Sequence, residues 1–324
     1  MSQQPSPPTA GPSRSAIAHL AMFATVAFWG AMFVVVKQAI VHIRPQWFNA
    51  FRMVIGCACL TLVWGRHWRG MTRAALLTGG AAGLSMAAGF FFQTQGLLYT
   101  SATNSAFLTA LVVVLVPLLA SIPGLRAAGG QSPHWAAWLG ALLAFGGVAL
   151  MTTPQGFRSL ALLHTMNRGD LLTLGCALGF ALQVIALEHG AARASLQQVS
   201  LMQLGTCMAI LCIAAVVSQR PTHGSPVRAA EILQPLSRPG TLLAVLAAGV
   251  LATAVGFTVQ AWAQHEIPAT NLAVILTLEP VFAWLTATVW MGERTSPRSA
   301  SGALLVLGGI AFSELFPRWR RPAG

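Results

Sequence analysis

Charged residues are scarce in this chain of 324 residues. They make up 8% of the sequence, and only seven of them are acidic, whereas about 25% of the residues in an ordinary soluble domain are charged. Hydrophobic residues make up 55%. Because a chain of this composition cannot cover its surface with polar groups, the sequence predicts an integral membrane protein.

The residue sets that most enzyme chemistry needs are also missing. Asp170 is the only aspartate, the eight histidines have no HxxxH or HExxH spacing, and there is no GxxxxGK sequence. The five cysteines lie in apolar stretches without CxxC spacing, which favours small packing residues over metal ligands or disulfides. We therefore expect no enzyme, no cofactor and no metal site. A membrane enzyme for lipid-linked substrates and a passive channel are the alternatives, and the channel lacks visible rings of like residues.

What the chain does contain is a series of apolar stretches of membrane-spanning length. Each approaches the roughly 20 residues that a bilayer requires, and the linking segments are often short. The sequence predicts ten transmembrane helices, at residues 17–36, 46–65, 73–93, 102–122, 134–152, 170–188, 199–218, 241–263, 270–291 and 299–316. The fold class we expect is therefore an all-α integral membrane protein.

One half of the chain repeats the other. At an offset of 167, Gly89, Phe90, Gln93 and the sequence Ala-Thr-Asn beginning at Ala102 recur from Gly256 onwards. At an offset of 162, the glycines of residues 140–149 recur in residues 302–311. Five spans per half, an odd number, place the second copy upside down relative to the first, as in many secondary transporters.

The repeat divides the chain into five parts. Residues 1–16, rich in proline, serine and glutamine, are expected to be disordered, and residues 153–169 are a linker. The repeats occupy residues 17–152 and 170–316, and residues 317–324 form a basic tail. An even number of spans puts both termini on one side, and the arginine clusters at residues 66–73 and 318–321 favour the cytoplasmic side.

Several sequence pieces resemble the EamA-type transporters of the drug/metabolite transporter superfamily, over nearly the whole chain. These pieces are Trp29-Gly30 with Lys37, Phe51-Arg52, residues 100–108, Gly169-Asp170-Leu171, Leu278-Glu279-Pro280-Val281 and Gly292-Glu293-Arg294. The resemblance implies a transporter of the inner (cytoplasmic) membrane for small solutes such as amino acids, amines, carboxylates, nucleosides or drugs. The resemblance covers both exporters and importers, and of the two we expect an exporter that works by alternating access.

Glu279 is the polar residue that the sequence singles out. It lies near the middle of the ninth span, where an ionised carboxylate costs about 2.5–3.5 kcal/mol to insert. Pro280 cannot donate to the Leu276 carbonyl, so a kink is expected beside the acid. The carboxylate either contacts a cationic solute or a coupled proton, or it serves the fold. The equivalent position in the first half is Val112.

The other candidates for solute contact are Trp29, Lys37, Gln93, Asn104, Gln260 and Asn271. Gln93 and Gln260 occupy equivalent positions, so the repeat symmetry predicts that they face one central cavity bounded by the first, third, fourth, sixth, eighth and ninth spans. Lys37 can instead reach the membrane interface, the two asparagines can link helices, and Arg52 is expected to be structural.

The expected partners are a small-molecule solute, the lipid bilayer and, as one alternative, a coupled proton. The net charge of +12 does not indicate nucleic acid, because the basic residues sit at span ends and not in one patch. They are placed to meet lipid headgroups. The oligomeric state does not follow from the sequence.

Overall fold

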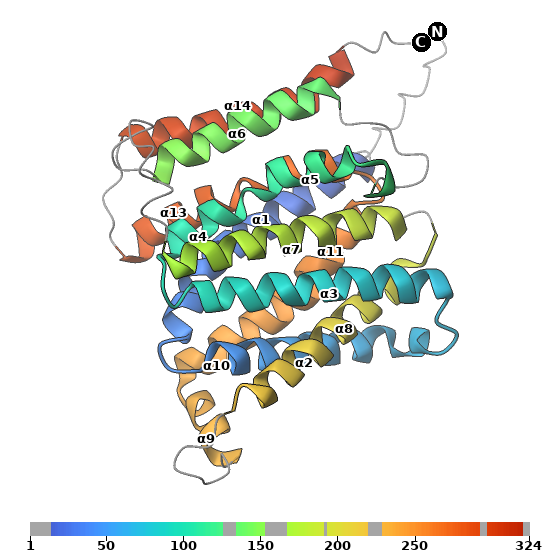
Figure 1. The fold of residues 1–324 in the computed structure, drawn as a ribbon, viewed down its shortest axis with the longest axis vertical. Helices are drawn as coiled ribbons and strands as arrows, with labels where there is room; N and C mark the ends of the chain where they lie inside the picture. Colours follow the sequence, from blue (N-terminus) through green and yellow to red (C-terminus); the bar gives the residue numbers. More distant parts are fainter. Residues whose placement is uncertain are drawn as a thin grey trace, which may run out of the picture.

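The structure is a computed structural model that describes residues 14–125, 134–152, 167–190, 193–219, 229–291 and 297–319. In these ranges the chain forms helices and no strand (Figure 1). The first half contains α1 (Arg14–Ala39), α2 (Pro45–Trp64), η1 (Gly65–Trp68), α3 (Arg73–Gly96), α4 (Ala102–Thr109), α5 (Val112–Ala120), η2 (Pro123–Leu125) and α6 (Trp135–Thr152). The second half contains α7 (Arg168–Gly190), α8 (Leu196–Val217), α9 (Ala229–Leu233), η5 (Gln234–Ser237), α10 (Pro239–Ala247), the π-helical η6 (Ala248–Val255), α11 (Gly256–Ala263), α12 (Ala269–Leu276), α13 (Glu279–Met291) and α14 (Pro297–Trp319).

Seven helical stretches of the described residues are long and apolar enough to cross a membrane, and three further apolar helices are shorter. Each of the ten spans expected from the sequence falls on one of these ten. The expected all-helical class is therefore confirmed. Residues 1–13, 153–166 and 320–324, which include most of the expected tails and linker, lie outside the described residues. α1 and α14 each extend three residues into the expected tails.

The fourth and ninth expected spans are each broken into two helices. α4 ends at Thr109 and α12 ends at Leu276, positions that are equivalent under the offset of 167. A tight turn closes each break, since the Leu111 N–H donates to the Leu108 carbonyl at 3.2 Å and the Leu278 N–H donates to the Ile275 carbonyl at 3.1 Å. The two halves are thus interrupted at the same place.

Proline accounts for only one of these breaks. Pro280 follows the break in the second half, where its missing N–H prevents a bond to Leu276, as expected. The equivalent position in the first half is Val113, yet the helix breaks there too. The interruption is therefore a feature of the repeat and does not depend on the proline.

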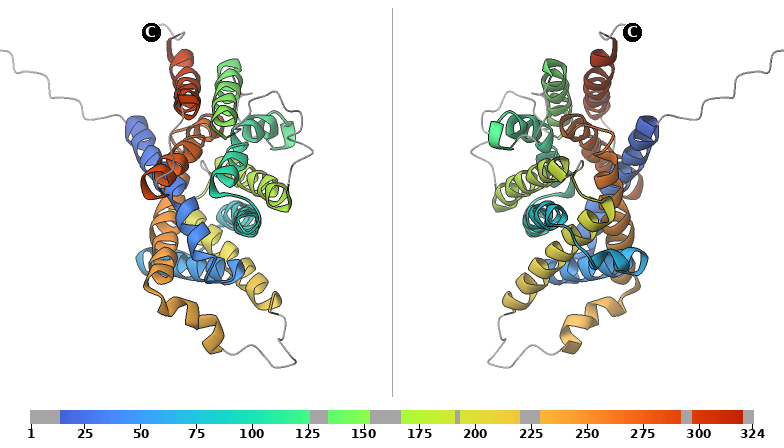
Figure 2. Two further views of the ribbon diagram at one scale, coloured as in Figure 1. Left: turned by 90° about the vertical axis from the view of Figure 1, so that its left-hand side faces the viewer. Right: turned by 90° about the vertical axis from the view of Figure 1, so that its right-hand side faces the viewer.

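α6 and α14 pack against each other at one end of the molecule, at the top of Figures 1 and 2. Two pairs of glycines allow this contact. Gly147 lies against the carbonyl of Gly302, and Gly309 lies against the carbonyl of Gly140. Because the residue numbers rise on one helix as they fall on the other, the helices are antiparallel. Side chains at these positions would hold the backbones apart.

Candidate functional site

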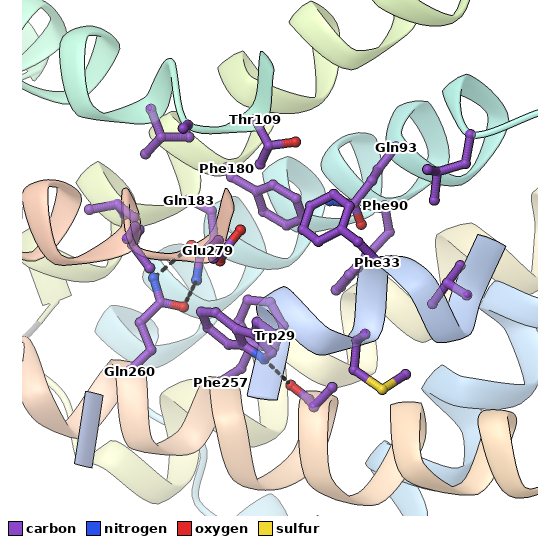
Figure 3. A pocket seen from close by; sticks show the side chains of 18 of the residues that line it. Trp29, Phe33, Phe90, Gln93, Thr109, Phe180, Gln183, Phe257, Gln260 and Glu279 are labelled. Atoms are coloured by element: carbon purple, nitrogen blue, oxygen red, sulfur yellow. Dashed lines mark hydrogen bonds between the residues drawn. The ribbon is translucent and has the colours of Figure 1, made fainter. Parts of the chain in front are cut away.

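A cavity in the middle of the molecule contains about 710 Å³ of space between atoms, counted out to its open side. Its walls come from α1, α3, α4, α5, α7, η6, α11, α12 and α13, and also from α2. The lining includes Gln93, Gln260 and Glu279, whose side chains Figure 3 shows around one space. The six spans that the repeat symmetry predicted therefore do surround a cavity, together with α2, which was not expected.

Four aromatic rings pack together on one side of the cavity (Figure 3). The rings of Phe90 and Phe257, which are equivalent under the repeat, meet edge to face with centroids 5.5 Å apart. Trp29 packs on Phe257 at 4.8 Å, and Phe180 packs on Phe90 at 5.2 Å. The contact between two equivalent residues places this cluster where the halves meet. It offers an apolar surface to the flat or aliphatic part of a solute.

Trp29 is fixed by its surroundings on α11 and η6. Its indole Nε1 donates to the Ala252 carbonyl at 2.8 Å. Gly256 lies under the ring, where a Cβ would stand 2.7 Å from that nitrogen. The adjacent Gly30 lies against the break between α12 and α13, because a Cβ there would stand 2.5 Å from the Glu279 carbonyl oxygen. The Trp29-Gly30 pair is thus both a cavity wall and a close helix contact.

Gln260 forms a reciprocal pair with Gln183 of α7. The Gln260 Nε2 donates to the Gln183 Oε1 at 3.1 Å, and the Gln183 Nε2 donates to the Gln260 Oε1 at 3.3 Å. Both side chains are buried. Gln93, its repeat equivalent, instead contacts the thiol of Cys176, which also meets the Thr109 hydroxyl at 3.6 Å. The two amides therefore face one cavity but have different partners.

Glu279 begins α13, immediately after the break, and its side chain is half-buried at the cavity wall. In the described part of the chain, its carboxylate has no hydrogen-bond or ion-pair partner. A carboxylate with this position is available to a cation or a proton in the cavity.

Arg52 lies on α2 with only 4% of its surface exposed, and it lines the same cavity. Its Nε and Nη2 donate to the Thr253 hydroxyl at 3.2 and 3.1 Å, and its guanidinium carbon lies 4.1 Å from the centre of the Phe90 ring. Among the described residues it has no acidic partner, and Nη1 makes no hydrogen bond. A buried cation that keeps a free donor can bind an anionic group.

The π-helical segment η6 shapes the surroundings of this arginine. Thr253 donates to the Ala248 carbonyl five residues earlier at 2.7 Å and thereby turns its hydroxyl oxygen towards Arg52. Gly249 lets the segment approach the backbone of α2, since a Cβ there would stand 2.9 Å from the Arg52 carbonyl oxygen. π-helical turns often occur at functional sites. Here the segment supplies contacts to both Arg52 and Trp29.

Two of the expected site residues, Lys37 and Asn271, do not line the cavity in the structure. The Lys37 ammonium donates to the Leu97 carbonyl and, at 2.9 Å, to the Thr100 carbonyl, so it binds the end of α3. Asn271 is half-buried in α12, outside the cavity lining. The side chain of Asn104 lies outside what the structure describes. Trp29, Gln93, Gln260 and Glu279 are the expected residues that the fold brings together.

Sequence reasoning missed Arg52, Gln183 and Thr109 as cavity residues. Arg52 carried a usable signal, because a charge several residues inside a span is expensive and is functional by default. Gln183 also lies within an apolar span, but it has no counterpart at the offset of 167 to draw attention to it. Thr109 could be identified as a cavity residue only from the structure, where α4 ends at this position.

The sequence was compared with protein families and known proteins. The model of the EamA-like transporter family matches residues 16–153 and again residues 167–315. A protein of Archaeoglobus fulgidus named "Uncharacterized transporter" is 29% identical over 298 residues, which cover 92% of this chain and 86% of that protein. A solved structure titled "Crystal structure of protein" has a TM-score of 0.70 at 21% identity and covers 96% of this chain and 100% of its own.

The two family matches cover nearly all of both repeats, and they agree with the membrane-spanning helices and with the family resemblance read from the sequence. The solved structure supports the fold alone. The chain is a multi-pass membrane protein and belongs to the EamA-like transporter family.

Proposed function

We propose that this protein is a secondary transporter of the cytoplasmic membrane and that its solute binds in the central cavity. The observation that carries the proposal is the pair Arg52 and Glu279, two opposite charges in one cavity that form no ion pair with each other. A charge that is withdrawn from water without an oppositely charged partner is costly. A solute that brings an anionic and a cationic group would satisfy both.

The remaining walls suggest what else the solute carries. Trp29, Phe90, Phe180 and Phe257 provide apolar area, and the amides Gln93 and Gln260 can orient polar groups. We therefore propose a small zwitterion with an apolar body, its carboxylate at Arg52 and its ammonium at Glu279. This choice lies within the amino-acid, amine and carboxylate classes that the sequence indicated.

The proposed mechanism is alternating access by two inverted repeats of five spans, with both termini in the cytoplasm. The reciprocal contacts of α6 with α14 support it, because equivalent helices that cross antiparallel through equivalent glycines are related by a two-fold axis. The breaks at Thr109 and Leu276 give each repeat a point about which half-helices can move. Export is the direction that we propose, although the family resemblance covers importers as well.

A matched set of ligands tests the proposed solute class. We would measure thermal unfolding of the purified protein with phenylalanine, phenethylamine and 3-phenylpropionate, which share one body and differ in charge. A bound ligand stabilises the fold by about 2.7 kcal/mol at a hundred times its dissociation constant. We expect phenylalanine to stabilise most, by more than either single-charge analogue. Equal or greater stabilisation by the amine or the acid would contradict the zwitterion assignment.

Transport itself is tested in sealed vesicles. We expect saturable flux of the stabilising zwitterion in vesicles that contain the protein. Non-saturating flux would indicate a channel, and turnover of the solute without flux would indicate an enzyme. The Arg52→Gln and Glu279→Gln variants separate the two charge contacts, because each should lower the preference for the zwitterion over a different analogue.

A further inference from the structure

A second hollow lies on the side of the molecule, between the beginning of α3 and the end of α7. It measures about 890 Å³ counted out to its open side. One end is basic, because it is lined by Arg73 from α3, by His189 from the last turn of α7 and by Arg193, which lies beyond the end of α7. None of the described residues that line this groove is acidic.

Among the described residues, no carboxylate forms an ion pair with Arg73, His189 or Arg193 at the basic end. Glu188 is next to His189 in the chain, but its Oε1 accepts a hydrogen bond from the Ala269 N–H at 3.2 Å, at the start of α12. Arg73 is the first residue of α3, whose first turn contains no acidic residue. A cation at a helix N-terminus is electrostatically unfavourable, and an anion there is favourable. The groove end therefore suits a negative group.

His189 is held in place at this end. Its Nδ1–H donates to the Ile185 carbonyl at 2.8 Å, which leaves Nε2 for another partner. Arg73 and Arg193 are exposed side chains, and no hydrogen bond or ion pair joins them to other described residues.

Apart from Thr78, the rest of the described groove lining is apolar, and it faces outward. Leu77, which is 65% exposed, and Ala81 line it on α3, and Ala186 lines it on α7. The distance from Arg73 to Ala81 along α3 is about 12 Å, at 1.5 Å per residue. A polar end joined to an apolar wall of this length matches a headgroup followed by the first part of an acyl chain.

We propose that this groove binds an anionic phospholipid of the surrounding bilayer. Its phosphate lies between Arg73 and Arg193, and its acyl chain follows Leu77, Ala81 and Ala186. A free phosphate ion would use the basic end but would leave the apolar wall uncovered. In the orientation proposed above, the groove end faces the cytoplasmic leaflet, where anionic lipids concentrate.

Native mass spectrometry of the full-length protein, released from nanodiscs of mixed dioleoyl-phosphatidylglycerol and dioleoyl-phosphatidylcholine, tests the site. Each arginine near an anionic lipid contributes roughly a fivefold gain in affinity. The double variant Arg73→Gln with Arg193→Gln loses both contributions, so we expect it to bind phosphatidylglycerol roughly 25-fold more weakly than the unchanged protein. The matched control is Arg66→Gln with Arg69→Gln, which removes two exposed arginines outside the groove.

A second variant separates lipid from free anion. Ala81→Phe keeps both arginines and fills the apolar wall at an exposed position, so phosphatidylglycerol retention should fall while the melting temperature in phosphatidylcholine nanodiscs stays the same. Equal retention of the two lipids by the unchanged protein would overturn the proposal. So would equal losses in the two double variants, or stabilisation by inorganic phosphate that matches that of phosphatidylglycerol and persists in Ala81→Phe.

Discussion

A Cβ atom added to Gly147 of α6 would stand 2.5 Å from the carbonyl oxygen of Gly302 of α14. The equivalent contact occurs at the other end of the crossing, where a Cβ on Gly309 would stand 2.7 Å from the Gly140 carbonyl oxygen. The offset of 162 converts Gly140 to Gly302 and Gly147 to Gly309. The same offset that relates the two sequence repeats therefore relates the two glycine contacts to each other.

This symmetry predicts that Gly147→Ala and Gly309→Ala destabilise the protein by similar amounts. Each methyl group would collide with backbone, and overpacking of this kind costs about 1–3 kcal/mol. Gly308 is the matched control, because a Cβ there meets nothing within 4 Å. Thermal unfolding in detergent measures the effect. Because alanine favours the helix over glycine, Gly308→Ala should not lose stability, and a loss as large as that in Gly309→Ala would show that the crossing is not responsible.

The buried amide pair of Gln183 and Gln260 predicts a coupled effect. Replacing either residue by leucine leaves the other buried amide without a hydrogen-bond partner, whereas replacing both leaves no unpaired amide. The double-mutant cycle should give a coupling energy of about 0.6–1.7 kcal/mol, the range found for polar pairs in membrane proteins. Gln264→Leu with Gln183→Leu is the control cycle, because Gln264 donates to the Val184 carbonyl and not to Gln183. Additive losses at Gln183 and Gln260 would contradict the pairing.

The proposed orientation predicts which loops a membrane-impermeant thiol reagent reaches. Ser237→Cys lies in η5 before α10 and should be labelled from outside intact cells, whereas Arg69→Cys lies between α2 and α3 and should react only after permeabilisation. Both positions are exposed. The native cysteines lie in helices and are buried or half-buried, and the unchanged protein provides the background. The opposite pattern would place the termini outside.

The helices were readable from the sequence because each carries enough apolar residues to satisfy the bilayer. Gln93 and Gln260 could be assigned to one cavity because the repeat relates them. The hydrogen-bond partners of the cavity residues could not be predicted from the sequence, because they lie far away along the chain. Gln183 contacts Gln260 across 77 positions of the chain, and Arg52 contacts Thr253 across 201.

Local sequence explains some breaks in the helices and not others. Pro280 predicted a kink beside Glu279, and the helix is interrupted just before that residue. The equivalent interruption after Thr109 has no proline at the equivalent position. The π-helical turn at residues 248–255 has no sequence signal of its own. Within this segment, Gly249 approaches the backbone of Arg52, a contact between distant parts of the chain that the sequence does not show.

Glu279 provides the last prediction. Its carboxylate lines the cavity without a partner among the described residues, so we expect it to meet a solute or a proton during transport. Glu279→Gln preserves the size of the side chain and removes its charge. A hydrogen bond to a charged group contributes about 1.5–3 kcal/mol. Loss of this free energy corresponds to a decrease of about tenfold to a hundredfold in transport of the zwitterion. The dependence of transport on pH should be lost with the carboxyl group.

The control for this prediction is Glu231→Gln, which removes an exposed acid of α9 outside the cavity. Its transport should match that of the unchanged protein. The melting temperature of Glu279→Gln decides between a role in transport and a role in the fold, because a carboxylate that meets only the solute can be neutralised without loss of stability. A folded Glu279→Gln protein with normal, pH-responsive transport would contradict the role in solute binding. A protein that fails to fold would show instead that the carboxylate stabilises the broken helix.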